Sequence, residues 1–261
     1  MLTPPEIARS LLAAGESKAR LPFGKMLLLA ILAGAYIALA GVGATAAAVT
    51  VESGSLAKLL SACVFPAGLS MVILAGSELF TGNCLMVMAL LERRITPAQL
   101  LRNWLTVYLG NAMGGAAVAA LAVYSHTASL FGDGLARSMV SIAESKAALG
   151  AGDAFLRGVL CNFLVCLAVW MAAASKRAEG KVIALFFPIL LFVLCGYEHC
   201  IANLYYLPAG AFAAAEYGVE TMLTLAGCLE NLAAVTLGNL VGGAALGAVS
   251  YTHLRAHETL M

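Results

Sequence analysis

Two stretches of this chain decide its fold: Gly76-Ser77-Glu78-Leu79-Phe80-Thr81-Gly82-Asn83 and Gly196-Tyr197-Glu198-His199-Cys200-Ile201-Ala202-Asn203. Both read G-x-E-x-x-x-x-N, and they lie 120 residues apart. Each interrupts a long apolar run with a carboxylate, an amide and a glycine. An ionisable group at membrane depth is costly and marks a functional site by default. A matching pair of interrupted segments predicts a substrate site at the interface between two repeats.

The composition is that of a membrane protein. Of the 261 residues, 62% are hydrophobic and 11% are charged, which is far from the norm for a soluble domain. Six apolar stretches reach the length of about 20 residues that a span needs; they are 26–50, 61–91, 104–124, 154–175, 182–212 and 223–248. The second and fifth carry the two motifs and are too long for one simple span. We therefore expect each to be two half-helices joined by a short loop.

A second internal match, at an offset of 128 residues, supports a duplication. The pattern Asn103…Leu109-Gly110-Asn111-x-x-Gly114-Gly115 in the third span recurs in the sixth as Asn231…Leu237-Gly238-Asn239-x-x-Gly242-Gly243. Small residues at these positions also let helices approach closely. Because three spans per half is an odd number, the halves are expected to be inverted. The sequence thus predicts an all-α membrane protein with six transmembrane helices in two inverted three-helix repeats, of which the second and fifth helices are broken.

Basic residues predict the orientation. Ten Lys and Arg lie in the N-terminal segment and the alternate connections, against four in the remaining connections. Both termini are therefore expected on the cytoplasmic side. Residues 1–25 are expected to be a cytoplasmic segment without a cleavable signal, in which Ser10–Arg20 forms an interfacial helix. Residues 249–261 resemble translated read-through of a sequencing adapter and are excluded from the fold, so no function is given to His253 or His257.

The cysteines and the net charge indicate few partners. All seven cysteines fall in apolar segments, and none forms a C-x-x-C pair. Cys195 and Cys200 flank His199, but small packing residues are the favoured interpretation. We therefore predict no metal site and no cofactor. A net charge of +1 does not indicate a nucleic-acid partner.

Together these motifs resemble the formate/nitrite transporter family of pentameric anion channels, over about Pro4 to Ala248. The resemblance is carried by Ala75–Asn83 in the second span, Leu160–Trp170 in the fourth and Gly196–Asn203 in the fifth, where Cys200 replaces the usual serine. It implies an aquaporin-like outline, a homopentamer with one pore in each protomer, and a location in the bacterial inner membrane. It also implies that residues 26–248 form a channel domain for small monovalent anions of weak acids, with formate or nitrite first.

The resemblance further implies which residues form the pore. An outer constriction is expected at Phe65, Leu69 and Phe192, and an inner one at Leu79 and Phe80. The chamber between them and the substrate pathway are expected to include Thr81, Lys146, Asn162, Glu198, His199 and Asn203. Glu78 and Asn83 are assigned to the structure of the first loop, with Glu78 capping the interrupted backbone.

Elementary chemistry favours a proton exchange at His199. Moving an anion into an apolar constriction has a large desolvation cost. The anion of a weak acid avoids that cost by taking up a proton and crossing as the neutral acid. His199 is the one histidine in the predicted membrane interior, and imidazole titrates near neutral pH. The N-termini of half-helices favour an anion nearby. Thr81 can both donate and accept a hydrogen bond.

Several alternatives stay open from the residues alone. Hydrosulfide, acetate and lactate-like acids would suit the same fold. An aquaporin-like pore for neutral solutes would need paired Asn-Pro-Ala loops, which neither motif contains. A membrane enzyme would need a metal or nucleophile constellation, and a pure scaffold would not need ionisable residues at depth. Singly, His199 also fits a core imidazole bonded to backbone, and Lys146 fits a surface lysine in an external loop.

Overall fold

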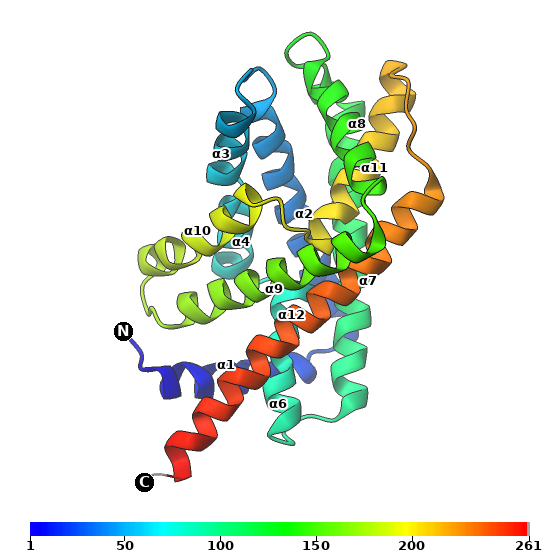
Figure 1. Cartoon of the computed structure of the whole chain (residues 1–261). Coiled ribbons are helices and arrows are strands. Elements are labelled where there is room, and N and C mark those ends of the chain that lie inside the picture. Colours follow the sequence, from blue (N-terminus) through cyan, green and yellow to red (C-terminus); the bar gives the residue numbers. More distant parts are fainter. Residues whose placement is uncertain (260–261) are drawn as a thin grey trace.

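The computed structural model describes residues 1–259, and their side chains as far as Ser250 (Figure 1). Side chains from Tyr251 onward, including those of His253 and His257, lie outside the described part, so the expected adapter read-through stays a prediction. In chain order the helices are α1 (Pro4–Ala19), α2 (Phe23–Ala48), α3 (Gly54–Val64), α4 (Pro66–Ala75), α5 (Phe80–Asn83), α6 (Val87–Leu91), α7 (Pro97–Tyr124), α8 (Gly134–Ala147), α9 (Ala151–Ala173), α10 (Ala178–Leu194), α11 (Cys200–Tyr217) and α12 (Leu225–Thr259). Short 3₁₀ turns cover Cys84–Met86 and Thr127–Ser129.

Several of these helices are long and apolar enough to cross a membrane. Within the described residues they are Phe23–Ala48, Gly54–Ala75, Pro97–Tyr124, Ala151–Ala173 and Leu225–Ser250. The predicted fifth span, 182–212, is not among them, because its residues are divided between α10 and α11, of 17 and 18 residues. The chain is therefore an all-helical membrane protein with five such apolar helices in its described part.

Both motif segments interrupt the helical structure. Helix α4 ends at Ala75 and α5 begins at Phe80, while α10 ends at Leu194 and α11 begins at Cys200. Gly76 and Gly196 have φ angles of +76° and +69°, a left-handed conformation that only glycine adopts without steric cost and that ends helices. The non-helical part is shorter than the motif, because the last four motif residues already belong to the following helix.

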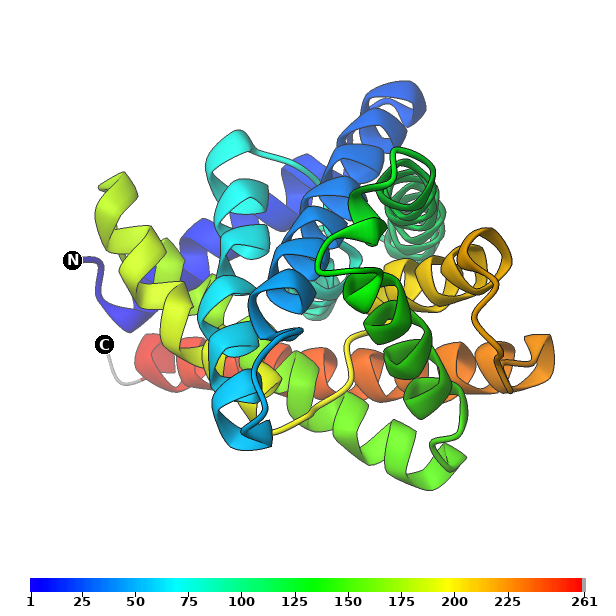
Figure 2. The same cartoon turned by 90° about the horizontal axis from the view of Figure 1, so that it is seen from above.

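The N-terminal helix is longer than the expected Ser10–Arg20. It begins at Pro4, because the Thr3 backbone N–H donates to the Glu6 carboxylate at 2.7 Å and proline suits the first helical position. One face of α1 is buried, including Ala8 and Leu12, and packs in a cluster with α6. The start of α1 and the end of α12 lie at the same side of the molecule (Figures 1 and 2).

Glycines allow two helix pairs to pack at very short range. Helix α2 packs against α7, and α9 runs beside α12 (Figure 2). A Cβ on Gly114 would lie 2.0 Å from the Ile31 carbonyl oxygen, and one on Gly242 would lie 2.1 Å from that of Val159. Both contacts are between backbones, so any side chain would force the helices apart. The glycines that matched in sequence therefore make matching contacts.

Candidate functional site

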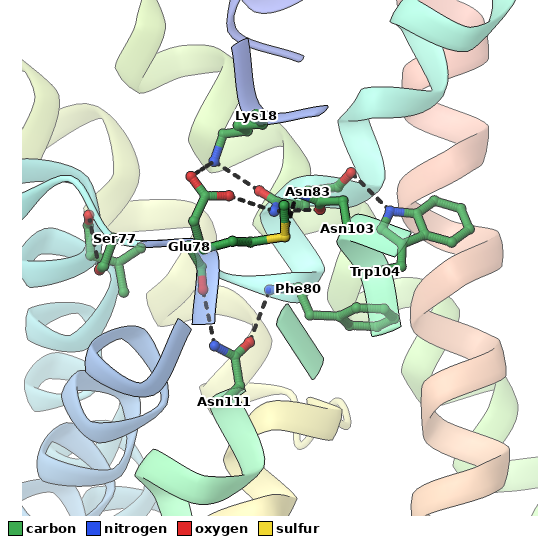
Figure 3. Close-up of polar contacts among 10 residues, drawn as sticks. Lys18, Ser77, Glu78, Phe80, Asn83, Asn103, Trp104 and Asn111 are labelled. Carbon is green, nitrogen blue, oxygen red and sulfur yellow. Dashed lines mark hydrogen bonds and ion pairs between the residues drawn. The ribbon is translucent and has the colours of Figure 1, made fainter. Parts of the chain in front are cut away.

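The carboxylate of the first break is buried and fully paired (Figure 3). Glu78 is 5% exposed, and its oxygens accept hydrogen bonds from Lys18 Nζ at 2.8 Å and Asn83 Nδ2 at 2.7 Å. Lys18, on α1, also donates to Asn83 Oδ1 at 2.9 Å. Asn83 Nδ2 in turn donates to Asn103 Oδ1 on α7 at 2.9 Å. Because a buried charge is costly unless it is paired and hydrogen-bonded, this network lets a carboxylate sit between helices.

The backbone of the first break is satisfied by one side chain from α7. Asn111 Nδ2 donates to the carbonyl oxygens of Ala30 at 2.7 Å and Glu78 at 2.9 Å, and Asn111 Oδ1 accepts from the Phe80 N–H at 3.0 Å (Figure 3). The expectation that the Glu78 side chain caps this backbone is therefore wrong. The partners of its carboxylate are side chains, and the amide of Asn111 does the capping, since an amide can donate and accept at once.

The carboxylate of the second break has the same kind of partners. Lys146 Nζ, on α8, donates to both oxygens of Glu198 at 3.0 and 2.9 Å. Asn203 Nδ2 donates to Glu198 at 2.7 Å and to Asn231 Oδ1 on α12 at 2.8 Å. Lys146 is thus a helix residue with 15% side-chain exposure rather than a free loop lysine. Asn203, predicted in the substrate pathway, takes the place that Asn83 has in the first half.

The backbone of the second break is also satisfied by one asparagine. Asn239 Nδ2 donates to the carbonyl oxygens of Gly158 at 2.8 Å and Glu198 at 2.9 Å, and Asn239 Oδ1 accepts from the Cys200 N–H at 2.8 Å. Asn111 and Asn239, which matched in the sequence at an offset of 128 residues, therefore do the same work in the two halves.

Lys18 is the site residue that the sequence analysis missed. It was counted only as a basic residue that orients the chain, yet it is the counterpart of Lys146. The signal was present, because Glu16-Ser17-Lys18-Ala19 and Glu144-Ser145-Lys146-Ala147 are identical and are also 128 residues apart. The internal sequence match therefore extends to α1 and α8.

His199 and Thr81 join the beginnings of the two helices that follow the breaks. His199 is 3% exposed and Thr81 is fully buried. His199 Nδ1 accepts a hydrogen bond from the Ala202 N–H at 3.1 Å, so it carries no proton, and the neutral ring has its proton on Nε2. Nε2 lies 3.0 Å from Thr81 Oγ1 and donates to it. This contact brings the two residues together. That both face a chamber of the pore stays a prediction.

Aromatic rings surround the histidine on one side. The Phe192 ring stacks on the His199 ring with centroids 5.8 Å apart, and the Phe65 ring meets Phe192 edge-on at 5.7 Å. These three residues line one cleft of about 360 Å³, which also includes Lys146 and Glu198. Phe65 and Phe192 therefore lie between helices and not in the lipid. Leu69 is buried in the same core cluster but does not line the cleft.

The expected inner constriction is tightly packed. Leu79 and Phe80 are each 3% exposed, and the Phe80 ring meets those of Tyr108 and Trp104 at 5.1 and 6.4 Å. Trp104 Nε1 donates to the Asn83 carbonyl oxygen at 3.1 Å. These residues form an apolar wall next to Thr81.

Asn162, on α9, hydrogen-bonds to the backbone of both α5 and α12. Its Nδ2 donates to the Thr81 carbonyl oxygen at 3.3 Å and to that of Asn239 at 2.6 Å. Cys166 Sγ is 3.4 Å from the same Thr81 oxygen. Asn162 therefore positions Thr81 through its backbone. Among the residues with described side chains, no three His, Cys, Asp or Glu are grouped to hold a metal ion.

The geometry of two paired breaks around a buried histidine matches a known family. A sequence model described as "Formate/nitrite transporter" matches residues 5–253. The chain belongs to the formate/nitrite transporter family. A "Probable formate transporter" of Methanothermobacter thermautotrophicus is 38% identical, over 98% of both chains. The "Formate channel FocA" of Haemophilus influenzae is 40% identical, over 82% of this chain and 81% of its own.

Solved structures of this family share the fold. An "FNT family ion channel" superposes with a TM-score of 0.85 at 31% identity, over 95% of this chain and 98% of its own. A "Pentameric formate channel with formate bound" superposes with a TM-score of 0.81 at 31% identity, over 90% of this chain and 98% of its own. The sequence resemblance is thus confirmed, and the protein is a multi-pass membrane channel of the formate/nitrite transporter family. Its relatives are transporters and channels, not enzymes.

Proposed function

We propose that this channel carries formate, and also nitrite, across the bacterial inner membrane, and that His199 exchanges a proton with the permeating anion. The observation that carries the proposal is the contact of His199 Nε2 with Thr81 Oγ1 at 3.0 Å. It puts one titratable ring where the starts of two half-helices meet, beside an aromatic pair. Two similar proteins are named as formate channels, one of them with formate bound.

The proposed architecture is a homopentamer of six-span protomers with cytoplasmic termini. Two inverted repeats are supported by the equal roles of Lys18 and Lys146, and of Asn111 and Asn239. The pentamer is supported by the pentameric channel that superposes on this chain. The orientation is supported by the ten-to-four split of basic residues.

The proposed path passes two apolar constrictions. Phe65, Leu69 and Phe192 form the outer one and Leu79 and Phe80 the inner one, with Thr81 and His199 between them. An apolar ring excludes bare ions through their desolvation cost. Two ion pairs, Glu198 with Lys146 and Glu78 with Lys18, stabilise the two interrupted segments and contribute to the electric field along the path. Asn83, Asn162 and Asn203 position these groups.

Proton exchange follows from the hydrogen bonds of the ring. At rest the ring is neutral, with Nδ1 accepting from the Ala202 N–H and Nε2 carrying the proton. A proton from solution that binds Nδ1, at the cost of the Ala202 bond, makes the imidazolium. Nε2 then passes its proton to the anion, and the neutral acid crosses the apolar constriction. The ring is left with its proton on Nδ1 and returns to the resting tautomer when Nε2 takes up a proton and Nδ1 releases one to solution. On the far side the acid releases the proton. Anion and proton thus move together.

Flux measurements in liposomes test the substrate. We expect the purified protein to speed the entry of formate and nitrite well above that of protein-free vesicles, measured by light scattering and by an internal pH dye. Hydrosulfide in the same assay decides between this substrate class and its closest rival. A protein that moves hydrosulfide but neither formate nor nitrite would contradict the proposal.

Widening the outer constriction should relax selectivity. In the double variant Phe65→Ala, Phe192→Ala the edge-on ring pair is lost, and larger monocarboxylates such as acetate and lactate should enter faster relative to formate. Rates for the three acids are compared with those of Phe187→Ala, a phenylalanine of α10 that is 61% exposed and outside the cleft. An unchanged order of rates in the double variant would mean that these rings do not line the path.

A further inference from the structure

The cleft lined by Phe65 and Phe192 has more cationic side chains than the one carboxylate in it can pair with. Three cationic side chains line it, Lys58 on α3, Lys146 on α8 and Arg157 on α9, against the single carboxylate of Glu198. Lys146 is paired with that carboxylate. In the part of the chain with described side chains, neither Lys58 nor Arg157 forms an ion pair or a side-chain hydrogen bond. Two exposed cations thus remain free to meet an anion.

The duplication shows that one of these cations is not required by the fold. The backbone carbonyl oxygen of Arg157 accepts from the Glu198 N–H at 3.3 Å, and in the first half Leu29 accepts from the Glu78 N–H at 3.2 Å. Arg157 and Leu29 therefore have the same backbone role. A leucine does it equally well, so the guanidinium is an addition at one mouth of the channel.

We propose that Lys58 and Arg157 form a capture site for small oxyanions in this cleft, which fills before an anion passes Phe65 and Phe192. A guanidinium binds a carboxylate or similar oxyanion through two parallel N–H bonds, and an ammonium adds a point charge. Three serines also line the cleft, Ser61, Ser141 and Ser145. The hydroxyls of Ser61 and Ser145 donate to the carbonyl oxygens of Ala44 and Ser141, so Ser141 is the one that offers a hydroxyl donor to an anion.

The size of the cleft explains why an anion can bind there with a small desolvation cost. Its volume is about 360 Å³, and a water molecule takes up about 30 Å³ of liquid. A formate-sized anion can therefore be held there with part of its hydration shell. The anion loses the rest of its hydration shell only where it passes between Phe65 and Phe192, and the desolvation cost arises there. Capture and selection are thus separated along the path.

This proposal rests on the proposed function and predicts an asymmetry in it. Formate entering from the cleft side should reach half-maximal rate at a lower concentration than formate entering from the other side, while the equilibrium distribution is unchanged. Sulfate, a divalent oxyanion too costly to desolvate in the constriction, should bind the same cations and inhibit entry from the cleft side only.

The test uses the full-length channel in liposomes of uniform orientation, with Arg157→Leu and Lys58→Ala as variants. In each, the half-saturating formate concentration on the cleft side should rise several-fold, up to about tenfold, at low ionic strength. Inhibition by sulfate, relative to sodium chloride of equal ionic strength, should be lost. Arg157→Lys should keep part of both effects. Arg137→Leu, which removes an exposed arginine of α8 outside the cleft, is the matched control and should behave as the parent.

A second measurement separates this proposal from the proposed function. Sulfate is titrated calorimetrically into the purified parent protein, where heat of binding is expected, and into the Arg157→Leu variant, where it should be lost. Formate transport without sulfate binding, or with equal variant effects on both sides, overturns the capture site and leaves the function standing. Sulfate binding that needs Arg157, in a protein that moves no formate, overturns the function and leaves the capture site.

Discussion

Replacing His199 with asparagine is expected to abolish proton-coupled formate transport. Asparagine keeps an acceptor for the Ala202 N–H and a donor near Thr81 but cannot titrate. Because a positioned acid–base group typically contributes about a hundredfold or more to a proton-transfer step, we expect the formate rate to fall by at least about that factor. The dependence of the remaining rate on pH between about 5 and 8 should also disappear. Initial rates in liposomes over this pH range are the measurement.

The control for this variant is His126→Asn. His126 lies in the connection between α7 and α8, next to the Thr127–Ser129 turn, and far from both breaks along the chain. It should transport formate at the parent rate with the parent pH profile. If the His199→Asn protein does the same, His199 is only a structural donor and the proton-exchange mechanism fails.

Replacing Asn111 with leucine is expected to be the most destabilising change in this part of the protein. It leaves the Phe80 N–H and the Glu78 carbonyl oxygen inside the molecule without the Asn111 partner, and removes a second bond from the Ala30 carbonyl oxygen, which keeps its helical one. A buried polar group left without a partner costs about 1–3 kcal/mol. The free energy of unfolding should therefore fall by about 2 kcal/mol or more, seen as a lower midpoint of thermal unfolding and a smaller folded fraction on size exclusion.

The duplication supplies a second form of the same prediction. Asn239→Leu strands the equivalent groups of the second break and should lose a similar amount of stability. Leu109→Ala on α7, a residue that is 61% exposed, is the control and should unfold near the parent temperature. If both asparagine variants unfold at the same midpoint temperature as the control, the hydrogen bonds of Asn111 and Asn239 do not stabilise the interrupted segments.

The sequence located the breaks because glycine and a buried carboxylate are strong local signals. Gly76 and Gly196 end their helices as the motif predicts, and the carboxylates are buried. What each carboxylate contacts was not predictable locally. Glu78 meets Lys18, which is 60 residues away on another helix, so its role as a backbone cap was assigned wrongly.

Other parts of the site depend on how distant segments meet. Phe65 and Phe192 read singly as ordinary apolar residues, and only the packing of α10 against α3 and α4 brings their rings together. Lys18 was overlooked because its position before the first span suits a topology signal equally well. The fifth span, 182–212, was predicted as two half-helices joined by a short loop. Its residues are divided between α10 and α11, and Gly196 lies in a left-handed conformation between them.

The central claim is that formate and a proton cross together through His199, and its most direct test is the effect of membrane potential on formate flux. A potential of 100 mV is worth about 2.3 kcal/mol for one charge, which is roughly a 50-fold change in the accumulation of a bare anion. In liposomes clamped with potassium and valinomycin, the account predicts that formate accumulation is unchanged by the potential and that the lumen gains one proton for each formate. Accumulation that follows the potential, with no matching acidification, would show that formate crosses as a bare anion and would contradict the account.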